Sequence, residues 1–331
     1  MKKIMIGVLC SLLLAGAPPV AAAQELSLGG QPVGIEVQTA GVLVAGFAEV
    51  SGAGESVSPA REAGLQEGDR IVQVGETRVN SAQEFIDAVT RRQGERVSLR
   101  LLRGGSEQTV ELQPVQAEDG QWMLGLWLRD QSAGIGTLTF YDPDTGIYGA
   151  LGHSVSDETT GEPLPIRGGQ ITDAQIVSVQ PGSRGAPGEL SGCADHAQVL
   201  GEIRKNSDKG IYGVAGRALG AGSAAVGVAT PGPASILTTL EGRQVRAYSV
   251  EISRVYQEQG AQRLLLTVTD PMLRQIAGGI VQGMSGSPIV QDGKLVGAVT
   301  HVLVNDPCRG YGIGIRDMLD EAGLAALGLA A

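Results

Sequence analysis

The sequence predicts a mainly β protein in two parts, a small α+β module followed by a larger antiparallel β-barrel or sandwich. Glycine supplies 50 of the 331 residues, about twice its usual share of about 7%. Glycines at this frequency oppose long helices and coiled coils, and they follow no three-residue period, which excludes collagen. Because 42% of the residues are apolar and 18% are charged, the chain can bury sizeable cores. Many short strands joined by tight turns fit these observations.

The N-terminal segment has the pattern of an export signal. Two lysines precede an apolar run over residues 4–15, and three alanines at 21–23 form a small-residue site where a signal peptidase could cut before Gln24. The apolar run is short for a membrane span. We therefore predict that residues 1–23 are a removed signal peptide or, alternatively, an uncut anchor on the outer face of the membrane. Residues 24–33 are a predicted linker.

Charge and cysteine content exclude some partners. The formal net charge is −10, and no dense patch of Lys and Arg occurs, so we expect no nucleic acid partner. Cys193 and His196 could be half of a metal site, but too few further ligands are visible, so we predict neither a metal nor a cofactor. In an oxidising compartment Cys193 and Cys308 could pair, which sequence distance alone does not decide.

Residues 34–116 show the pattern of a small domain with one main helix. Apolar runs at 42–44 and 71–74 are typical of short strands. A helix is predicted over residues 82–92, because Asn and Ser precede it as capping residues and its apolar residues recur at helical spacing. The residues expected on one face of this helix are Phe85, Ile86 and Val89.

The pattern Ala-Gly-Leu-x-x-Gly-Asp-x-Ile at residues 63–71 resembles the core motif of PDZ domains. PDZ domains bind an extended peptide, usually a free C-terminus, between an edge strand and a helix. The resemblance implies a peptide groove between residues 42–47 and the helix 82–92, although the module could instead be a spacer. The nearest counterpart of the loop that binds a terminal carboxylate is at residues 41–44. The groove residues that the resemblance implies are Val42, Leu43, Val44, Phe85 and Val89.

The second part, residues 117–331, begins where the chain turns polar. Its apolar runs are short and are separated by Gly, Pro, Asp and Asn, which is typical of an antiparallel barrel or sandwich. The clearest of these runs lie at residues 134–140, 175–179, 263–268 and 295–304.

Residues 283–288, Gly-Met-Ser-Gly-Ser-Pro, have the composition of a loop that presents a nucleophilic serine. Acyl transfer needs a hydroxyl on a tight turn, with backbone N–H groups aimed at the carbonyl oxygen that gains charge. The hexapeptide is similar to the Gly-Asp-Ser-Gly-Gly-Pro turn of chymotrypsin-like proteases. We therefore predict Ser285 as the nucleophile, with the N–H groups of Gly283 and Ser285 as the oxyanion hole. We expect Gly286 to let substrate approach closely, and Ser287 is a weaker alternative nucleophile.

A serine nucleophile needs a general base, and the sequence contains three histidines. His153 precedes Ser285, the order of chymotrypsin-like enzymes, and is the predicted base. For His301 we predict a structural role in the core. Candidates for the carboxylate that orients the imidazole are Asp270, Asp157, Asp142 and Asp130, among which spacing alone does not choose.

Three longer segments, residues 148–153, 278–289 and 298–307, closely resemble the sporulation stage IV protein B peptidases. The resemblance implies a chymotrypsin-like β-barrel and a triad of His153, Asp270 and Ser285. Family members are exported serine endopeptidases of endospore formers that act between forespore and mother cell. They cleave themselves near the N-terminus and cut a regulator that restrains an intramembrane metalloprotease, which releases a late sigma factor.

The resemblance thus implies a protein substrate, a peptide tail in the PDZ groove and membrane association through the N-terminus. Two alternatives from other functional classes stay open. The protein could be a non-catalytic exported scaffold that acts through its PDZ-like groove, or a serine esterase, because the same triad supports ester hydrolysis.

Overall fold

The computed structural model describes residues 25–51, 56–157 and 161–324. The predicted signal peptide or anchor, residues 1–23, lies outside the described residues. Within these described ranges, no helix is long and apolar enough to cross a membrane.

The described residues are mainly β, as predicted, with four short helices. The helices are α1 (Pro59–Glu62), α2 (Ala82–Thr90), α3 (Pro271–Ala277) and α4 (Ile315–Glu321). The strands of the first half are β1 (Glu25–Leu28), β2 (Pro32–Phe47), β3 (Arg70–Val74), β4 (Thr77–Arg78), β5 (Val97–Arg103), β6 (Ser106–Leu112), β7 (Val115–Gln116), β8 (Trp122–Met123), β9 (Leu126–Tyr141) and β10 (Ile147–Ala150). The strands of the second half are β11 (Ile166–Gln180), β12 (Glu189–Ser207), β13 (Gly210–Ala215), β14 (Ser223–Ala225), β15 (Gly232–Thr239), β16 (Val245–Glu258), β17 (Ala261–Val268), β18 (Pro288–Gln291), β19 (Lys294–Leu303) and β20 (Asp306–Gly314).

The C-terminal part contains a closed antiparallel barrel of strands β15-β16-β17-β20-β19-β18. Alternation along β17 explains the closure, because Leu264, Leu266 and Val268 are fully buried inside while the residues between them are half-buried. Asp292 and Gly293 both have positive φ and form the predicted hairpin turn between β18 and β19. The predicted antiparallel barrel is therefore confirmed.

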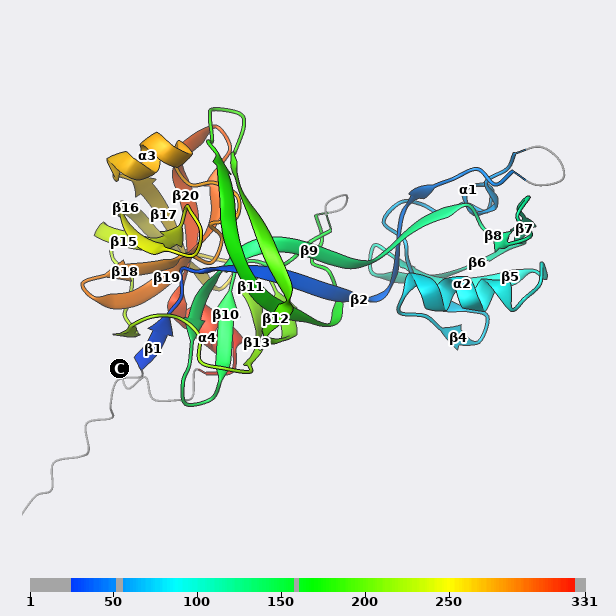
Figure 1. Ribbon diagram of the computed structural model, residues 1–331, viewed down its shortest axis with the longest axis horizontal. Helices are drawn as coiled ribbons and strands as arrows, with labels where there is room; N and C mark the ends of the chain where they lie inside the picture. The colour runs from blue at the N-terminus through cyan, green and yellow to red at the C-terminus, as the bar shows by residue number, and fades with distance from the viewer. Residues whose placement is uncertain (1–24, 52–55, 158–160, 325–331) are drawn as a thin grey trace, which may run out of the picture.

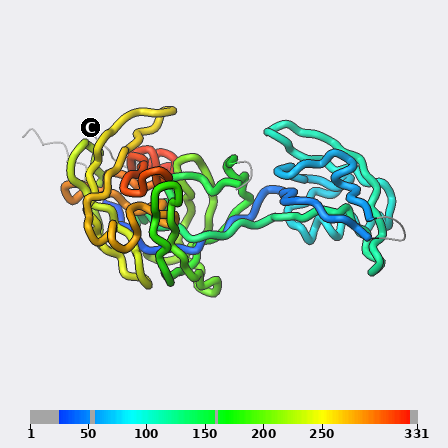
Figure 2. Tube along the Cα trace, turned by 90° about the horizontal axis from the view of Figure 1, so that it is seen from above, coloured from blue at the N-terminus to red at the C-terminus, as the bar shows by residue number. Residues whose placement is uncertain are grey.

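Two long antiparallel strands, β2 and β9, connect the barrel part with the N-terminal module (Figures 1 and 2). Residues 32–38 of β2 pair with residues 131–137 of β9 beside the barrel, whereas residues 43–47 pair with residues 126–129 inside the module. Both strands belong to a 12-stranded sheet that also contains β3, β5 and β6 of the module. The two parts thus share one continuous sheet.

The N-terminal module has its own core, in which α2 packs on the sheet. Ser81 accepts a hydrogen bond of 3.1 Å from the Glu84 N–H, and the Glu84 carboxylate accepts one of 2.7 Å from the Asn80 N–H, which together cap the helix as the sequence predicts. Phe85 and Val89 are buried, but Ile86, predicted on the same face, is 46% exposed.

The predicted peptide groove between residues 42–47 and α2 is filled in the structure. Strand β2 pairs with β3 on one edge and with β9 on the other, so it has no free edge toward the helix. Leu126 and Leu128 of β9 pack against the same core as α2. The reason is that a segment beyond the predicted domain boundary returns to complete the sheet. Val42, Val44, Phe85 and Val89 are consequently buried in the core of the module, whereas Leu43, which is also buried, borders a pocket that it shares with Arg70 and Arg103.

Candidate active site

The loop that carries Ser285 joins α3 to β18 and depends on glycines in positive-φ conformations. Gly278 ends α3 with a φ of 73°, and Gly283 and Gly286 on either side of the serine have φ values of 93° and 95°. Ser285 is half-buried, and its Oγ donates a hydrogen bond of 2.6 Å to the carbonyl oxygen of Thr300 in β19. The predicted tight turn around Ser285 is present.

Two buried threonines of strand β9 bind this loop through hydrogen bonds. The Thr137 Oγ1 donates to the carbonyl oxygen of Gly283 at 2.8 Å, and its backbone N–H donates to the carbonyl oxygen of Ser285 at 3.0 Å. The Thr139 Oγ1 donates to the carbonyl oxygen of Gly286 at 2.8 Å. Sequence reasoning missed both threonines, although their spacing of two in a strand places them on one face.

The structure packs Gly286 closely and buries Ser287, the weaker of the two candidate nucleophiles. A Cβ at Gly286 would lie 2.0 Å from the Thr137 carbonyl oxygen and 2.5 Å from the Leu151 nitrogen, so close backbone packing requires the glycine. Ser287 is fully buried, and its hydroxyl has no hydrogen-bond partner among the described residues. A buried hydroxyl cannot meet a substrate, which leaves Ser285 as the serine of this loop that opens to the surface.

His153 follows β10 after two positive-φ residues, Leu151 and Gly152, which turn the chain back toward β19. Its Nδ1 lies 2.7 Å from the carbonyl oxygen of Ser154. A carbonyl oxygen only accepts, so Nδ1 carries the proton and Nε2 of the neutral ring has a free lone pair. Burial lowers the pKa of His153, while the hydrogen bond to Ser154 acts in the opposite direction. The ring is therefore neutral, and Nε2 is the nitrogen that can accept a proton.

His301 is not the core residue that the sequence predicts. It is exposed on β19, and its ring lies 4.5 Å from the ring of His153 between centroids, with a tilt of 32°. Desolvation, followed by repulsion from the protonated form of His153 and from Arg263, lowers the pKa of His301 to about 4. Both rings are therefore neutral at neutral pH.

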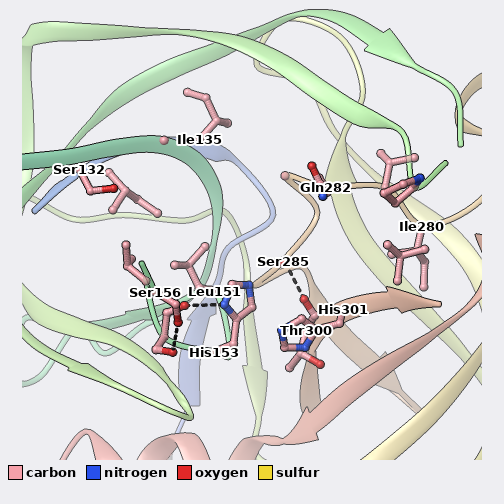
Figure 3. A pocket seen from close by; sticks show the side chains of 18 of the residues that line it. Ser132, Ile135, Leu151, His153, Ser156, Ile280, Gln282, Ser285, Thr300 and His301 are labelled. Carbon is pink, nitrogen blue, oxygen red and sulfur yellow. Dashed lines mark hydrogen bonds between the residues drawn. The ribbon is translucent and has the colours of Figure 1, made fainter. Parts of the chain in front are cut away.

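Ser285, His153 and His301 line one cavity of about 680 Å³, bounded by β9, the serine loop and β19 (Figure 3). Its other walls are mainly apolar, with Ile135 and Val302 among the side chains that reach it. Among the described residues that line it, none is Asp, Glu, Lys or Arg. A substrate side chain that enters this cavity meets no opposite charge, which favours an uncharged group.

The N–H groups proposed for the oxyanion hole are not used within the loop. Met284 donates its N–H to Val281 and Gly286 donates to Val299, whereas no backbone partner occurs among the described residues for the N–H groups of Gly283 and Ser285. Two free N–H donors beside a serine hydroxyl are what an oxyanion needs.

The structure does not bring Asp270 to His153. Asp270 is the N-cap of α3, where one carboxylate oxygen accepts from the N–H groups of Met272 and Leu273 at 2.9 and 3.0 Å. The other oxygen accepts from the Ser249 N–H at 3.2 Å. Helix capping thus uses one oxygen and a bond to β16 uses the other, and Asp270 is absent from the described lining of the cavity.

The alternative carboxylates also lie elsewhere. Asp130 accepts from the Ala82 N–H at the start of α2, and Asp142 accepts from the Thr145 hydroxyl in the turn before β10. Asp157 is buried and lines a neighbouring pocket with Thr39. The group found at the imidazole Nδ1 is instead the backbone carbonyl of Ser154.

The two cysteines of the described residues are free thiols, so the possible disulfide is not formed. Cys193 is exposed on β12, and the Cys308 sulfur lies 3.6 Å from the carbonyl oxygen of Gly278. His196 pairs through Nδ1 with the Glu36 carboxylate. No cluster of three or more metal-ligating side chains occurs in the part of the chain that the structure describes.

Comparisons with known proteins match both parts of the chain. The family model described as SpoIVB peptidase S55 matches residues 120–319, and the PDZ domain model matches residues 33–113. The crystal structure of the PDZ domain of the SdrC-like protein from Listeria monocytogenes is 25% identical over 28% of this chain and 93% of that chain, with a TM-score of 0.23. The structure of Rv3671c from M. tuberculosis H37Rv, a serine-to-alanine mutant in an inactive form, is 13% identical over 59% of this chain and 84% of that chain, with a TM-score of 0.33.

Proposed function

This chain belongs to the SpoIVB peptidase S55 family, and on that premise we propose that Ser285 and His153 form the catalytic pair of a serine endopeptidase. The family and the PDZ match support a serine endopeptidase that acts on protein substrates and binds peptides. The observation that carries the residue assignment is the shared cavity, in which the Ser285 hydroxyl and a neutral imidazole with a free Nε2 face the same space.

The proposed reaction begins with rotation of the Ser285 hydroxyl. Its proton is held by the Thr300 carbonyl, so the side chain must turn from Thr300 toward Nε2 of His153 before attack. His153 then takes the proton as Oγ attacks the peptide carbonyl, and the N–H groups of Gly283 and Ser285 bind the oxyanion. His153 returns the proton to the leaving amine, and a water molecule hydrolyses the acyl-enzyme by the same steps in reverse order.

The carbonyl of Ser154 takes the orienting position in this scheme. It holds the tautomer of His153 by accepting the Nδ1 proton. A neutral carbonyl stabilises the imidazolium less than a carboxylate does, so a modest catalytic rate is expected. Asp270 would join the pair only if the start of α3 rearranged.

We extend the proposal to the family's role, in which an exported enzyme cleaves itself near the N-terminus and cuts a regulator of an intramembrane metalloprotease during sporulation. The predicted export signal at residues 1–23 and the PDZ match at residues 33–113 support this role. A groove for a peptide tail would lie beside β9, since β9 occupies the edge of β2.

Labelling with a fluorophosphonate tests the catalytic pair. The wild type is expected to form an adduct at Ser285, and Ser285→Ala and His153→Ala are expected to form none. Adduct formation that persists in Ser285→Ala would refute the nucleophile. Wild type that fails to react, beside a protease that does, would favour the scaffold alternative. A panel of matched peptides and esters separates an endopeptidase from an esterase, and N-terminal sequencing of wild type and Ser285→Ala tests self-cleavage.

A further inference from the structure

Beside the candidate active site, no strand of the described residues pairs with one edge of β9. Between residues 126 and 137, β9 pairs on one edge with β2. On the opposite edge, β10 pairs only with residues 138–141, and no other described strand covers the rest. The free edge therefore extends from the N-terminal module to the loop that carries Ser285.

The register shows which groups on this edge are available. The Thr137 N–H donates to Ser285, which lies on the side away from β2, while the Leu138 N–H donates to Gln31 toward β2. The β9–β2 register is regular from Thr137 back to Gln131, so alternate residues point the same way. The N–H and C=O groups of Ile135 and Ala133 therefore point away from β2, like those of Thr137.

These groups have no hydrogen-bond partner outside β9 among the described residues, and Ala133 and Ile135 both line the cavity. No hydrogen bond from another described residue outside β9 reaches the backbone of Ala133 or Ile135. Both residues line the cavity that contains Ser285, and Ala133 is exposed. A row of free backbone donors and acceptors at a sheet edge is a template for another extended chain.

We propose that the substrate main chain pairs as an added antiparallel strand with Ala133 and Ile135 of β9, in an inference that rests on the proposed endopeptidase function. Every strand pair of the sheet is antiparallel, and an added strand continues that pattern. The occupant is an unfolded polypeptide segment, because folded substrates have their own backbone hydrogen bonds satisfied.

Antiparallel pairing also decides which side of the scissile bond is held. β9 runs toward Ser285, so a paired strand runs away from it. The residues opposite Ile135 and then Ala133 therefore follow the carbonyl that Ser285 attacks. The enzyme would recognise the carboxyl side of the cleavage site through its main chain, independently of sequence.

The same edge continues along β9 to Leu126 in the N-terminal module, where the Asp130 carboxylate caps α2. Nine steps from Ile135 to Leu126 correspond to about 30 Å of strand at about 3.3 Å per residue. A chain paired along the whole edge would reach the module about ten residues after the cleaved bond.

The test uses fluorescein-labelled casein, an unfolded polypeptide. A cleavage site is identified by mass spectrometry, and peptides that retain one, two or four residues after the cleaved bond are then compared. For wild type we expect kcat/KM to rise about two- to tenfold when the second and later residues are present, as one or two hydrogen bonds would give.

Ala133→Pro removes the free N–H without touching the bonds to β2, and is expected to lose this gain. Ala133→Val keeps the N–H and is expected to retain it. A gain that survives in Ala133→Pro would overturn the proposal. A damaged fold would instead lower kcat/KM equally for all three peptide lengths, and the amide exchange of Ala133 and Ile135 then decides whether the edge pairs.

Backbone amide exchange in Ser285→Ala gives a readout that needs no catalysis. In the free protein we expect fast exchange at Ala133 and Ile135 and slow exchange at Ser132 and Gly134. Added casein is expected to slow the two fast amides. If wild type neither cleaves casein nor reacts with a fluorophosphonate, the proposed function fails, and the exchange result still decides whether the edge binds an extended chain. Unchanged exchange at both amides would refute the pairing.

Discussion

Thr137 holds Ser285 directly, because the backbone N–H of Thr137 in β9 donates a hydrogen bond of 3.0 Å to the Ser285 carbonyl oxygen. The Thr137 hydroxyl donates a second hydrogen bond, to the Gly283 carbonyl oxygen. Thr137 therefore binds both residues of the proposed oxyanion hole. Since β9 also forms part of the N-terminal module, the position of the serine loop depends on a strand shared by both parts.

Thr137→Val tests this anchoring. The change keeps the shape of the side chain but leaves the Gly283 carbonyl without its donor. We expect the free energy of unfolding to fall by about 1–3 kcal/mol and kcat/KM to fall about tenfold or more, because the oxyanion donors shift. Denaturant titration and kinetics provide the measurements.

Thr238→Val is the matched control for Thr137→Val. Thr238 is fully buried, but its hydroxyl has no partner among the described residues. Valine at this position is expected to leave stability unchanged or raise it. Equal effects of the two changes would show that the bond to Gly283 has no special role.

Asp270→Asn separates the two roles of this aspartate. Asparagine caps helices about as well as aspartate but loses the bond from Ser249, so a residue with only these structural roles should lose some stability and little activity. A triad aspartate replaced by asparagine costs roughly 10⁴-fold in kcat in serine proteases. For Asp270→Asn we expect a change in kcat of less than about tenfold. A loss of the larger size would restore Asp270 to the triad.

The activity should persist below the usual pKa of histidine. His153 acts as a base only when neutral, and burial lowers its pKa from 6.5. The acidic limb of kcat/KM is therefore expected to have its midpoint below pH 6.5, where the pH drops through the lowered pKa. A pH profile with its acidic limb above pH 6.5 would contradict the burial of the free-enzyme imidazole.

Stability should change with pH in the same direction. Both histidines have lowered pKa values in the folded protein, His301 to about 4, so below the ordinary value of 6.5 the unfolded chain binds protons that the folded chain does not. The free energy of unfolding is thus expected to fall as the pH drops below 6.5. Thermal melts of wild type and His301→Gln measure this, and the variant should show the smaller drop.

Gly286→Ala should be strongly destabilising. A Cβ would clash with the Thr137 carbonyl at 2.0 Å, and the φ of 95° is unfavourable for alanine. We expect a loss of more than about 2 kcal/mol, since both backbone strain and a main-chain clash are involved. Gly168→Ala is the control, because its nearest neighbour lies at 3.9 Å and its φ is not positive, so little change is expected in denaturant titrations.

Local signals in the sequence predicted several features of the fold and of the candidate site. The Asn80-Ser81 cap, the Asp292-Gly293 hairpin and the glycine turn around Ser285 each depend on neighbours within a few residues, and each is present. The position of His153 in the same cavity as Ser285 was predicted by chain order and resemblance.

Other features depend on strands that are distant in sequence. Sheet register brings Thr137 to Ser285 and places β9 on the edge of β2, and no local propensity encodes either pairing. Asp270 is a different case. The resemblance implied that its carboxylate orients His153, whereas the structure shows local capping bonds to Met272 and Leu273.

The sequence by itself determined a glycine-rich β protein with a tight turn around Ser285, since turn geometry and strand alternation are local properties. Only the tertiary structure decided why the glycines are needed. A Cβ at Gly149 would meet the Phe140 ring and one at Gly286 the Thr137 carbonyl, so both glycines allow neighbouring segments to pack closely. The tertiary structure also decided that the Ser154 carbonyl binds the His153 ring and that one edge of β9 stays open among the described strands. Hydrogen-bond partners across a sheet follow from register.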